Sequence, residues 1–246
     1  MAVDKTETRI RRMFGEIAPS YDRLNHLLSM SIDRWWRRTT VRTVAPQAGA
    51  GPILDVCTGT GDLALAYDRA AGGGIPIVGA DFCRPMLALG RTKGASAGAA
   101  RRLIFVEADA QRLPFPDDTF QIVCVAFGLR NVTDTDRGLR EMSRVCRPGW
   151  RVAVLEFSRP RFRPFRALYD WYFAHVLPRI GQWLSGSSQQ AYSYLPASVG
   201  EFPCGAALAE RMGAAGLDDV MFQPLTLGIA TLYVGRKPPM PVAPQP

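Results

Sequence analysis

Two glycines and two acids follow an apolar run that begins near residue 53, and residues of these types can surround a small charged ligand. The run ends at Asp55, Gly59 and Gly61 form a short loop, and Asp62 opens a pattern typical of a helix. Glycines permit positive φ values and a close approach of the backbone to a ligand. The N–H groups of the following helix favour an anionic group. The glycine spacing also fits a dinucleotide fingerprint or an ordinary strand-to-helix turn.

The charges around this loop favour a ligand with positive groups over a pyrophosphate. Neither Lys nor Arg occurs between residues 53 and 68, whereas acids stand on both sides of the glycines. A ligand that carries a sulfonium and an ammonium group suits such carboxylates, and S-adenosylmethionine is one. Its own carboxylate would meet the helix N-terminus. We therefore expect S-adenosylmethionine as the cofactor, with Asp55, Gly59 and Gly61 in its site.

Acids also follow the next two predicted strands. Asp81 comes directly after the apolar residues 75–80 and lies 20 residues beyond Gly61, where a carboxylate at a strand end binds a ribose diol. Asp109 follows the predicted strand 103–106 and is placed to accept a hydrogen bond from an adenine amino group. An acid in a surface turn is the alternative for Asp109.

Apolar runs alternate with helical patterns through the first 157 residues, which predicts a doubly wound, mostly parallel α/β sheet. The expected strands begin near residue 53 and lie at 75–80, 103–106, 121–127 and 151–157. A turn is expected at 147–149, a helix near 204–215 and two closing strands within 225–235. Ligands lie at the carboxyl ends of the strands in such sheets. Asp55, Gly59, Asp81, Asp109 and Arg130 are all expected at that edge.

The amino-terminal residues 1–45 are expected to form a helical lid. Residues 4–18 carry apolar side chains at helical spacing with arginines alongside, and Asp33 is a candidate N-cap for a second helix. Both helices precede the first strand, so they are able to fold over the glycine loop. A plain helical cover for the sheet is the alternative.

Residues 160–200 combine aromatic residues with arginines. This mixture predicts an insertion that faces an apolar substrate or a membrane interface, with a buried core helix as the alternative. The insertion and the preceding residues are expected to belong to one domain, 1–236. The proline-rich tail, 237–246, is expected to be disordered.

The composition limits the partners and the metal chemistry. The net charge of +8 favours an anionic partner, either a membrane surface or nucleic acid. The basic residues are spread rather than clustered, so we expect no nucleic acid. The five cysteines never approach CxxC spacing and the two histidines, His26 and His175, are far apart, so no metal site is expected. We also expect the cysteines to be buried thiols in a reducing cytosol. We expect neither a signal peptide nor a transmembrane segment.

Several stretches match the motifs of one enzyme family. They are Met13-Phe14, Ile17-Ala18-x-x-Tyr21-Asp22-x-Leu24-Asn25, Arg34-x-Trp36-Arg37, Asp55-Val56-x-x-Gly59-Thr60-Gly61-Asp62, Phe127-Gly128-Leu129-Arg130-Asn131-Val132-Thr133-Asp134, Leu155-Glu156-Phe157-Ser158, Tyr194-Leu195-Pro196-x-Ser198 and Leu225-Thr226-x-Gly228-Ile229-Ala230. Together they resemble the quinone C-methyltransferases of menaquinone and ubiquinone biosynthesis. The resemblance covers residues 9 to 236, and the run that begins at Phe127 is its most specific part.

The resemblance implies the seven-stranded class I methyltransferase fold and several site residues. It implies cofactor contacts at Thr60, Asp81, Asp109 and Ala110, and lid contacts with the substrate at Tyr21 and Asp22. The family often has a serine where this chain has Ala126. The resemblance further implies a polyprenylated quinol substrate and a cytoplasmic enzyme at the periphery of the membrane. A homo-oligomer is left open.

The implied reaction is the transfer of a methyl group to an aromatic carbon. That carbon becomes nucleophilic when a neighbouring ring hydroxyl, with a pKa near ~10, loses its proton. Arg130 is placed to hold the developing oxyanion, with Asn131 orienting it or a bound water. A simple ion pair is the alternative role for Arg130. The resemblance favours demethylmenaquinol as the substrate, with 2-polyprenyl-6-methoxy-1,4-benzoquinol as the alternative. More distant alternatives are an RNA-directed methyltransferase and a non-catalytic cofactor-binding partner.

Overall fold

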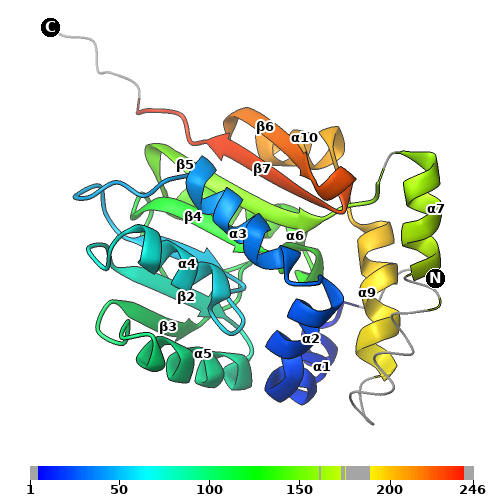
Figure 1. Ribbon diagram of the computed structural model, residues 1–246. Coiled ribbons are helices and arrows are strands. Elements are labelled where there is room, and N and C mark those ends of the chain that lie inside the picture. The colour runs from blue at the N-terminus through cyan, green and yellow to red at the C-terminus, as the bar shows by residue number, and fades with distance from the viewer. Residues whose placement is uncertain (1–4, 161, 173–174, 176–188, 241–246) are drawn as a thin grey trace, which may run out of the picture.

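A seven-stranded sheet forms the centre of the protein (Figure 1), in a computed structural model that describes residues 5–160, 162–172, 175 and 189–240. The strand order is β3-β2-β1-β4-β5-β7-β6. The strands are β1 (Ile53–Val56), β2 (Ile77–Asp81), β3 (Leu103–Glu107), β4 (Phe120–Ala126), β5 (Cys146–Phe157), β6 (Asp218–Leu225) and β7 (Ala230–Arg236). The first five are parallel, and β7 runs antiparallel to both its neighbours. The predicted doubly wound sheet is confirmed.

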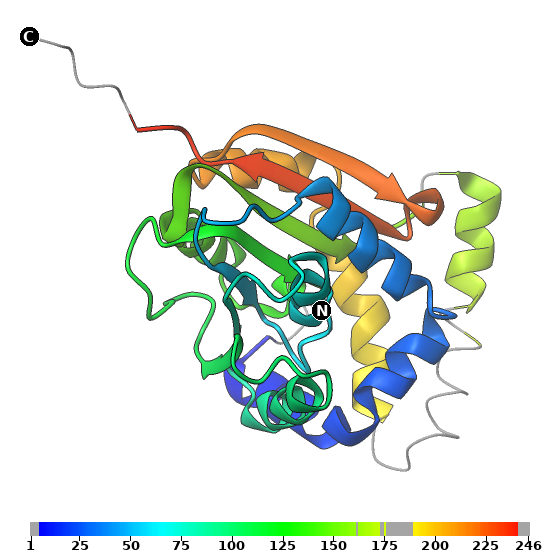
Figure 2. The same cartoon turned by 60° about the vertical axis from the view of Figure 1, so that its left-hand side comes forward.

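Two hydrophobic layers hold helices on the two faces of the sheet, because successive strand residues point to opposite sides. The layer that contains Val123 and Val125 of β4 also contains residues of α6 (Thr135–Val145) and α10 (Ala206–Ala214). The layer that contains Ile122 and Cys124 meets α3 (Ile32–Thr43), α4 (Asp62–Ala70) and α5 (Arg84–Ser96). Figure 2 shows α3 lying across the front of the sheet.

Four further helices gather beside the carboxyl ends of the strands, on the right of Figure 1. They are α1 (Glu7–Ile17), α2 (Tyr21–Leu28), α7 (Arg163–Trp171) and α9 (Gln189–Glu201). Ile10 and Met13 of α1 pack against Tyr194 of α9, and a 3-10 turn at Ala18–Ser20 joins α1 to α2. The division into a lid at 1–45 and an insertion at 160–200 stays a prediction. Residues 161, 173–174 and 176–188 of that insertion lie outside the described residues.

The prediction that Asp33 caps a helix is wrong. Asp33 lies in the first turn of α3, and Ser31, at a φ of 61°, precedes the helix without a capping hydrogen bond from its side chain. The Asp33 carboxylate instead accepts hydrogen bonds from Ser29 Oγ, at 2.7 Å, and from the Arg37 guanidinium. These side-chain partners draw Asp33 into the protein and away from the free N–H groups of the helix.

Two predicted boundaries in the carboxyl half also need correction. Residues 147–149 lie within β5 rather than in a turn, because β5 already pairs with β4 at Cys146. The register of this pairing shifts between Phe120 and Ile122, so the extra residues of β5 remain in the strand as an irregularity. The segment 225–235 holds only one complete strand. Its partner β6 begins earlier, and the exposed surface of β6 explains why no apolar run marks it. Residues 241–246 of the predicted disordered tail lie outside the described residues.

No helix in the described part of the chain combines the length and the apolar character needed to cross a bilayer.

Candidate functional site

The carboxyl ends of β1 to β4 meet at one cavity, as parallel strands require. Six of the residues expected at the site line this cavity, namely Tyr21, Gly59, Asp81, Asp109, Ala110 and Asn131. Five do not line it, namely Asp22, Asp55, Thr60, Gly61 and Arg130. Three carboxylates belong to the lining, while no lysine or arginine among the described residues does. This charge balance fits a ligand with sulfonium and ammonium groups better than it fits a pyrophosphate.

Asp81 joins the end of β2 to the glycine loop. Its two carboxylate oxygens accept hydrogen bonds from the backbone N–H groups of Gly59 and Cys83, each at 2.8 Å. Burial raises the pKa of Asp81 to about 6, although these backbone N–H groups oppose the shift. Each oxygen of a carboxylate accepts more than one hydrogen bond. Asp81 therefore keeps acceptor capacity for a ribose diol while it holds the loop in place.

Asp55 lies beneath the loop rather than on the cavity wall. Its Oδ2 accepts hydrogen bonds from the Thr58 hydroxyl at 2.6 Å and from the Ala64 N–H at 3.1 Å. Burial raises the pKa of Asp55 to about 7. The carboxylate thus fastens the loop to the start of α4, and any contact with a ligand passes through the loop.

The loop conformation depends on small residues at two close approaches. A Cβ atom at Gly61, where φ is 83°, would lie 2.8 Å from the Phe105 ring. A Cβ atom at Gly128 would lie 2.3 Å from Cys57 Cβ, and Cys57 itself has a φ of 51°. Real Cβ atoms do not approach this closely, so the β1 and β4 loops meet only because residue 128 is a glycine.

Asp109 is held in place by the residue two positions along the chain. The N–H and Nε2 of Gln111 donate to Asp109 Oδ1 at 2.9 and 3.1 Å, and Gln111 Oε1 accepts from the Asp134 N–H at 3.0 Å. Gln111 also lines the cavity and was missed in the sequence, where a lone glutamine in a loop carries no signal.

The cavity has an apolar wall that the sequence motifs did not reveal as such. Phe14 of α1 and Phe82 and Met86 beside β2 line it. Such side chains suit the flat face of an adenine, and Ala126 extends this wall at the position where the family often has a serine. Helical spacing marked Phe14 and Met86 only as apolar, because side chains of both core and cavity share that pattern.

Asp22 connects the lid helix α2 to the glycine loop. It accepts hydrogen bonds from the Thr60 hydroxyl at 2.6 Å and from Lys93 Nζ at 2.7 Å. Lys93 also pairs with Asp62 at 2.5 Å. The Thr60 hydroxyl therefore donates to the lid in this structure, and the predicted contact between Thr60 and the cofactor stays a prediction.

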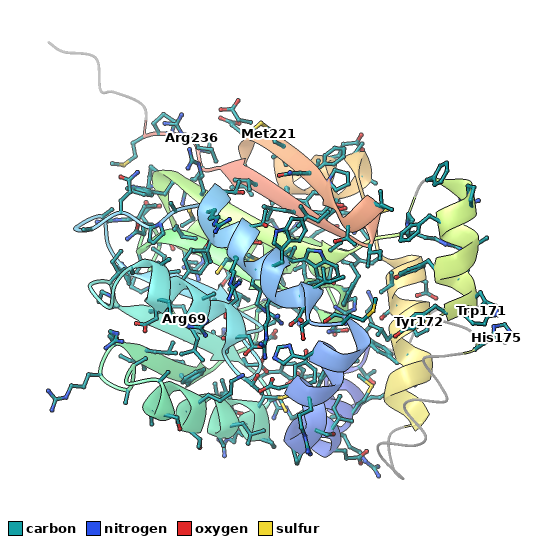
Figure 3. The ribbon with its side chains drawn as sticks, in the orientation of Figure 1. Arg69, Trp171, Tyr172, His175, Met221 and Arg236 are labelled. Carbon is teal, nitrogen blue, oxygen red and sulfur yellow. The ribbon has the colours of Figure 1, made fainter. Side chains whose placement is uncertain are left out.

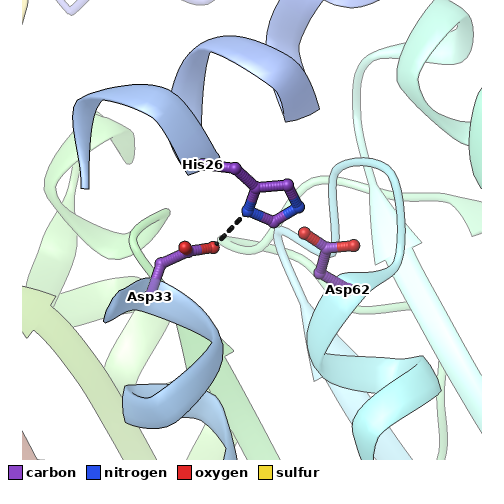
Figure 4. A group of neighbouring side chains, drawn as sticks. All are labelled: His26, Asp33 and Asp62. Atoms are coloured by element: carbon purple, nitrogen blue, oxygen red, sulfur yellow. Dashed lines mark hydrogen bonds and ion pairs between the residues drawn. The ribbon is translucent and has the colours of Figure 1, made fainter. Parts of the chain in front are cut away.

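His26 of α2, Asp33 of α3 and Asp62 of α4 form a compact group between these helices (Figure 4), with candidate ligand atoms within 4.8 Å of one another. The His26 ring lies 2.9 Å from Asp33 Oδ2. Both carboxylates already pair with cations, since Arg37 contacts both and Lys93 contacts Asp62. Burial opposes ionisation, yet these partners hold the pKa of Asp33 and of Asp62 below the ordinary value. We interpret the group as an ion-pair network between the lid and α4.

Arg130 lies behind the cavity wall and is paired. Its Nη1 contacts Glu156 Oε1 at 2.8 Å and also donates to the Phe127 carbonyl, while its guanidinium lies 5.2 Å from the Phe157 ring centre. Both Arg130 and Glu156 are buried, and Arg130 Nε has no hydrogen-bond partner. The ion pair weighed as the alternative role for Arg130 is therefore present.

Asn131, in contrast, reaches the cavity. Its Oδ1 accepts a hydrogen bond from the Tyr194 hydroxyl at 3.0 Å, which links the end of β4 to α9. An amide whose oxygen is engaged in this way keeps its two N–H groups as donors. Asn131 is thus the member of the predicted catalytic pair that a ligand in the cavity would meet.

The pKa values of three tyrosines reflect the charge of Arg130. Burial raises the pKa of Tyr21, Tyr169 and Tyr194, to about 12 for Tyr194, while the charge of Arg130 acts in the opposite direction on all three. Arg130 therefore favours a phenolate in its neighbourhood, and the tyrosines themselves stay protonated. The same charge would lower the pKa of another phenol placed among them.

Comparison with known proteins gives one consistent family. A model of the ubiE/COQ5 methyltransferase family matches residues 2–237. The "Ubiquinone/menaquinone biosynthesis C-methyltransferase UbiE" of Geobacter sulfurreducens is 48% identical over 229 residues, which are 93% of this chain and 88% of that protein. The "Demethylmenaquinone methyltransferase" of Thermus thermophilus is 48% identical over 226 residues, 92% of this chain and 100% of that protein.

Solved structures share the fold at low sequence identity. An S-adenosylmethionine-dependent methyltransferase from Thermotoga maritima has a TM-score of 0.65 and 16% identity, with 92% of this chain and 98% of that chain covered. Phosphoethanolamine N-methyltransferase 2 from Haemonchus contortus, solved with S-adenosyl-L-methionine, has a TM-score of 0.61 and 15% identity, with coverages of 82% and 52%. The class I methyltransferase fold expected for the sheet is confirmed.

The contact between Gly128 and Cys57 predicts a steric defect that a second substitution relieves. We expect Gly128→Ala to lower the free energy of unfolding by ~1–3 kcal/mol, the usual cost of forcing an atom into a packed site, and to weaken cofactor binding. Cys57→Gly removes the obstructing atom and accepts the positive φ, so the double variant should regain both properties. Urea unfolding and calorimetry measure them. Gly213→Ala, in open space on α10, is the control, and no rescue in the double variant would contradict this contact.

The buried Asp55 predicts that stability changes with pH. An unfolded Asp has a pKa of ~3.9, whereas burial raises the pKa of Asp55 to about 7 in the folded protein. The folded protein therefore binds this proton more tightly, and stability should fall as the pH rises through this interval. Urea unfolding at a series of pH values should show a shallower fall for Asp55→Asn, with the share from Asp81 remaining. Asp219→Asn, exposed on β6, should keep the full slope, and an unchanged slope in Asp55→Asn would refute the assignment.

Proposed function

Because the chain belongs to the ubiE/COQ5 methyltransferase family, we propose that it methylates a ring carbon of a polyprenylated quinol, with S-adenosylmethionine as the methyl donor. The observation that carries the proposal is the position of Asn131. It lines the carboxylate-bearing cavity and stands directly before the buried Arg130–Glu156 pair. A cofactor site and a group able to bind a ring oxygen therefore share one wall.

Demethylmenaquinol, converted to menaquinol, is the substrate we propose. Relatives from Thermus thermophilus and Deinococcus radiodurans bear the name demethylmenaquinone methyltransferase. The relatives from Geobacter species bear a name that covers ubiquinone as well, so 2-polyprenyl-6-methoxy-1,4-benzoquinol is the second candidate. In both cases the reduced ring is the substrate, since an oxidised quinone is electron-poor and a bad nucleophile.

Different residues of the cavity suit different groups of the cofactor. When bound, the cofactor supplies an activated methyl group on a positive sulfur. The carboxylates of Asp81 and Asp109 suit the ribose and adenine groups, and Phe82 and Met86 cover the apolar faces. Gly59 and Gly61 shape the loop that carries the remaining backbone donors.

Asn131 and Arg130 act on the ring oxygen of the quinol. The Asn131 amide donates to this oxygen, because Tyr194 already occupies the amide oxygen. Arg130 favours the phenolate through its charge, without leaving Glu156. Donors that are fixed before the reaction stabilise a developing oxyanion without reorganisation. In this proposal water accepts the hydroxyl proton. The proton of the methylated ring carbon leaves as the ring regains its aromaticity, and the ring oxygen takes up a proton again, so one proton is released overall.

Tyr21 and Asp22 place the lid over the site. Tyr21 lines the cavity from the start of α2, and Asp22 binds the glycine loop through Thr60. The proposed substrate role of Tyr21 therefore rests on its position in the cavity wall. The proposed role of Asp22 is to hold the lid closed through Thr60. The insertion at 160–200 would shield the remaining side of the ring.

Peripheral association with a membrane forms part of the proposal, because a polyprenyl tail resides in the bilayer. Two segments that combine arginines with apolar side chains, α1 and residues 161–183, are the first candidates for this contact. On α1, however, Arg11 pairs with Glu7 and Arg12 with Glu16, at 2.7 and 2.8 Å. These pairs offset the positive charge of that helix.

The direct test is methyl transfer from labelled cofactor to short-chain quinols that are kept reduced. Naphthoquinol and benzoquinol rings are compared side by side in one assay. Turnover with the naphthoquinol alone supports the first candidate, and turnover with the benzoquinol alone replaces it with the second. Cofactor binding without turnover on either ring would instead favour a non-catalytic partner protein. A salt-dependent gel shift would favour an RNA-directed enzyme.

The buried pair predicts how a mechanistic variant must be built. Arg130→Ala alone leaves Glu156 unpaired, which typically costs ~3–5 kcal/mol of stability. Arg130→Met combined with Glu156→Gln removes both charges and should fold. Its kcat should fall by roughly 100–1000-fold, the usual loss for one oxyanion-stabilising group, while the cofactor Kd changes little.

The matched control is the pair of Arg144 and Glu141, which are 2.7 Å apart and both lie on α6. Neither residue lines the cavity. Arg144→Met with Glu141→Gln should keep full kcat. Full activity in the Arg130 and Glu156 double variant would refute the mechanism, whichever ring is methylated.

A further inference from the structure

Three large apolar side chains protrude where α3 meets the turn between β6 and β7. Met30 is 77% exposed, Trp35 is 48% exposed and Leu227 is 68% exposed. Trp36 Nε1 donates a hydrogen bond to Thr226 Oγ1 at 2.8 Å, which joins the first half of α3 to the 3-10 turn η4 (Thr226–Gly228). The start of α3, which carries Trp35, therefore adjoins the turn that carries Leu227.

The backbone holds two of these side chains outward in an unfavourable conformation. Met30 has a φ of 50° and Leu227 a φ of 55°. For bulky residues this left-handed region is a genuine outlier, and glycine would adopt it freely. Nothing in the packing of the fold needs a methionine or a leucine there, since most of each side chain meets solvent. Outliers of this kind mark candidate functional positions.

On the two chain segments that carry these side chains, the exposed charges are of one sign. In the described stretch 23–43 the exposed charged residues are all arginines, namely Arg23, Arg34, Arg38 and Arg42, and the acid Asp33 is buried. The turn 224–230 contains no charged residue. Unlike the arginines of α1, those of α3 have no acid exposed on the same helix to offset them.

We propose that Met30, Trp35 and Leu227, with Arg34 and Arg38, form the surface by which the protein docks on an anionic phospholipid membrane. We name these five residues the α3–η4 patch. Apolar side chains beside unpaired basic groups suit the boundary between headgroups and acyl chains. Three separate protruding side chains form far less than the ~800 Å² per partner of a stable protein interface. A lipid surface therefore fits the α3–η4 patch better than a second copy does.

The position of the α3–η4 patch connects it with the site. Trp36 packs in one cluster with Phe127 and Phe157, which follow β4 and end β5 beside Arg130. A membrane in contact with the α3–η4 patch would therefore lie beside the carboxyl edge of the sheet, where an apolar substrate must enter. The inference rests on the membrane association in the proposed function and adds the surface that provides it.

The test uses the full chain and vesicles of phosphatidylglycerol and phosphatidylcholine in equal parts. Met30→Gly combined with Leu227→Gly removes two apolar side chains at positions where glycine relieves the backbone, so the protein should stay folded. Sedimentation with the vesicles should show at least a tenfold loss of partitioning, because burial of each side chain contributes about that much. Arg34→Ser combined with Arg38→Ser should reduce partitioning by about 25-fold at low salt, or about fivefold per basic group.

Matched controls come from elsewhere on the surface. Met221, 71% exposed on β6, and Arg69, exposed on α4, lie at the top and on the left of Figure 3, whereas Trp171 lies at the right. Met221→Ser and Arg69→Ser should bind vesicles as the unchanged protein does.

Two outcomes would overturn the inference. One is unchanged vesicle binding in both α3–η4 patch variants. The other is dimerisation of the unchanged protein, by sedimentation velocity, that the glycine variant abolishes, because this would assign the patch to a second copy. Methyl transfer to a short-chain soluble quinol, measured in parallel, should be the same in the glycine variant. Absence of turnover in every protein would refute the proposed function while leaving the vesicle result readable.

Discussion

The Asp81 carboxylate is the contact on which the site depends most. It ends β2, accepts the N–H of Gly59 in the glycine loop and accepts the N–H of Cys83 at the start of α5. The end of β2, the start of α5 two residues later and the glycine loop 22 residues earlier therefore meet at two oxygens. Burial raises the pKa of this group to about 6, so its ionisation is costly. Each of its oxygens can accept more than one hydrogen bond, which leaves acceptor capacity for a ligand. Asp55 repeats the arrangement one strand away, where it fastens the loop to α4 from below.

A second constraint separates the positive charge of the site from its ligand. Arg130 is fixed by Glu156 and by a backbone carbonyl, so it cannot swing into the cavity without leaving two partners. Asn131 stands in front of it, and Tyr194 sets the direction of the amide. In the proposed complex, the carboxylates lie on the side of the cationic cofactor. The guanidinium favours the phenolate from behind Asn131, so each ligand meets groups of opposite charge.

The sequence predicted the sheet and the acids at the edge of the cavity because both rest on local patterns. In β2 and β3 an apolar run leads to an acid, and parallel topology then brings Asp81 and Asp109 to one edge without knowledge of any long-range contact. Long-range contacts explain what was missed. The pairing of Arg130 with Glu156 spans 26 residues and that of Tyr194 with Asn131 spans 63. Neither leaves a periodic signal, and β6 left none because its surface is exposed.

Calorimetry on Asp81→Asn is the sharpest test of whether the carboxylates at the strand ends hold S-adenosylmethionine. This substitution keeps the volume and one of the two acceptors that hold the backbone, but it removes the charge and replaces the other oxygen with an NH2 donor. We expect cofactor binding to weaken by ~1–3 kcal/mol, roughly 5- to 150-fold in Kd, while the protein stays folded. An affinity equal to that of the unchanged protein would refute the role of Asp81 in cofactor binding.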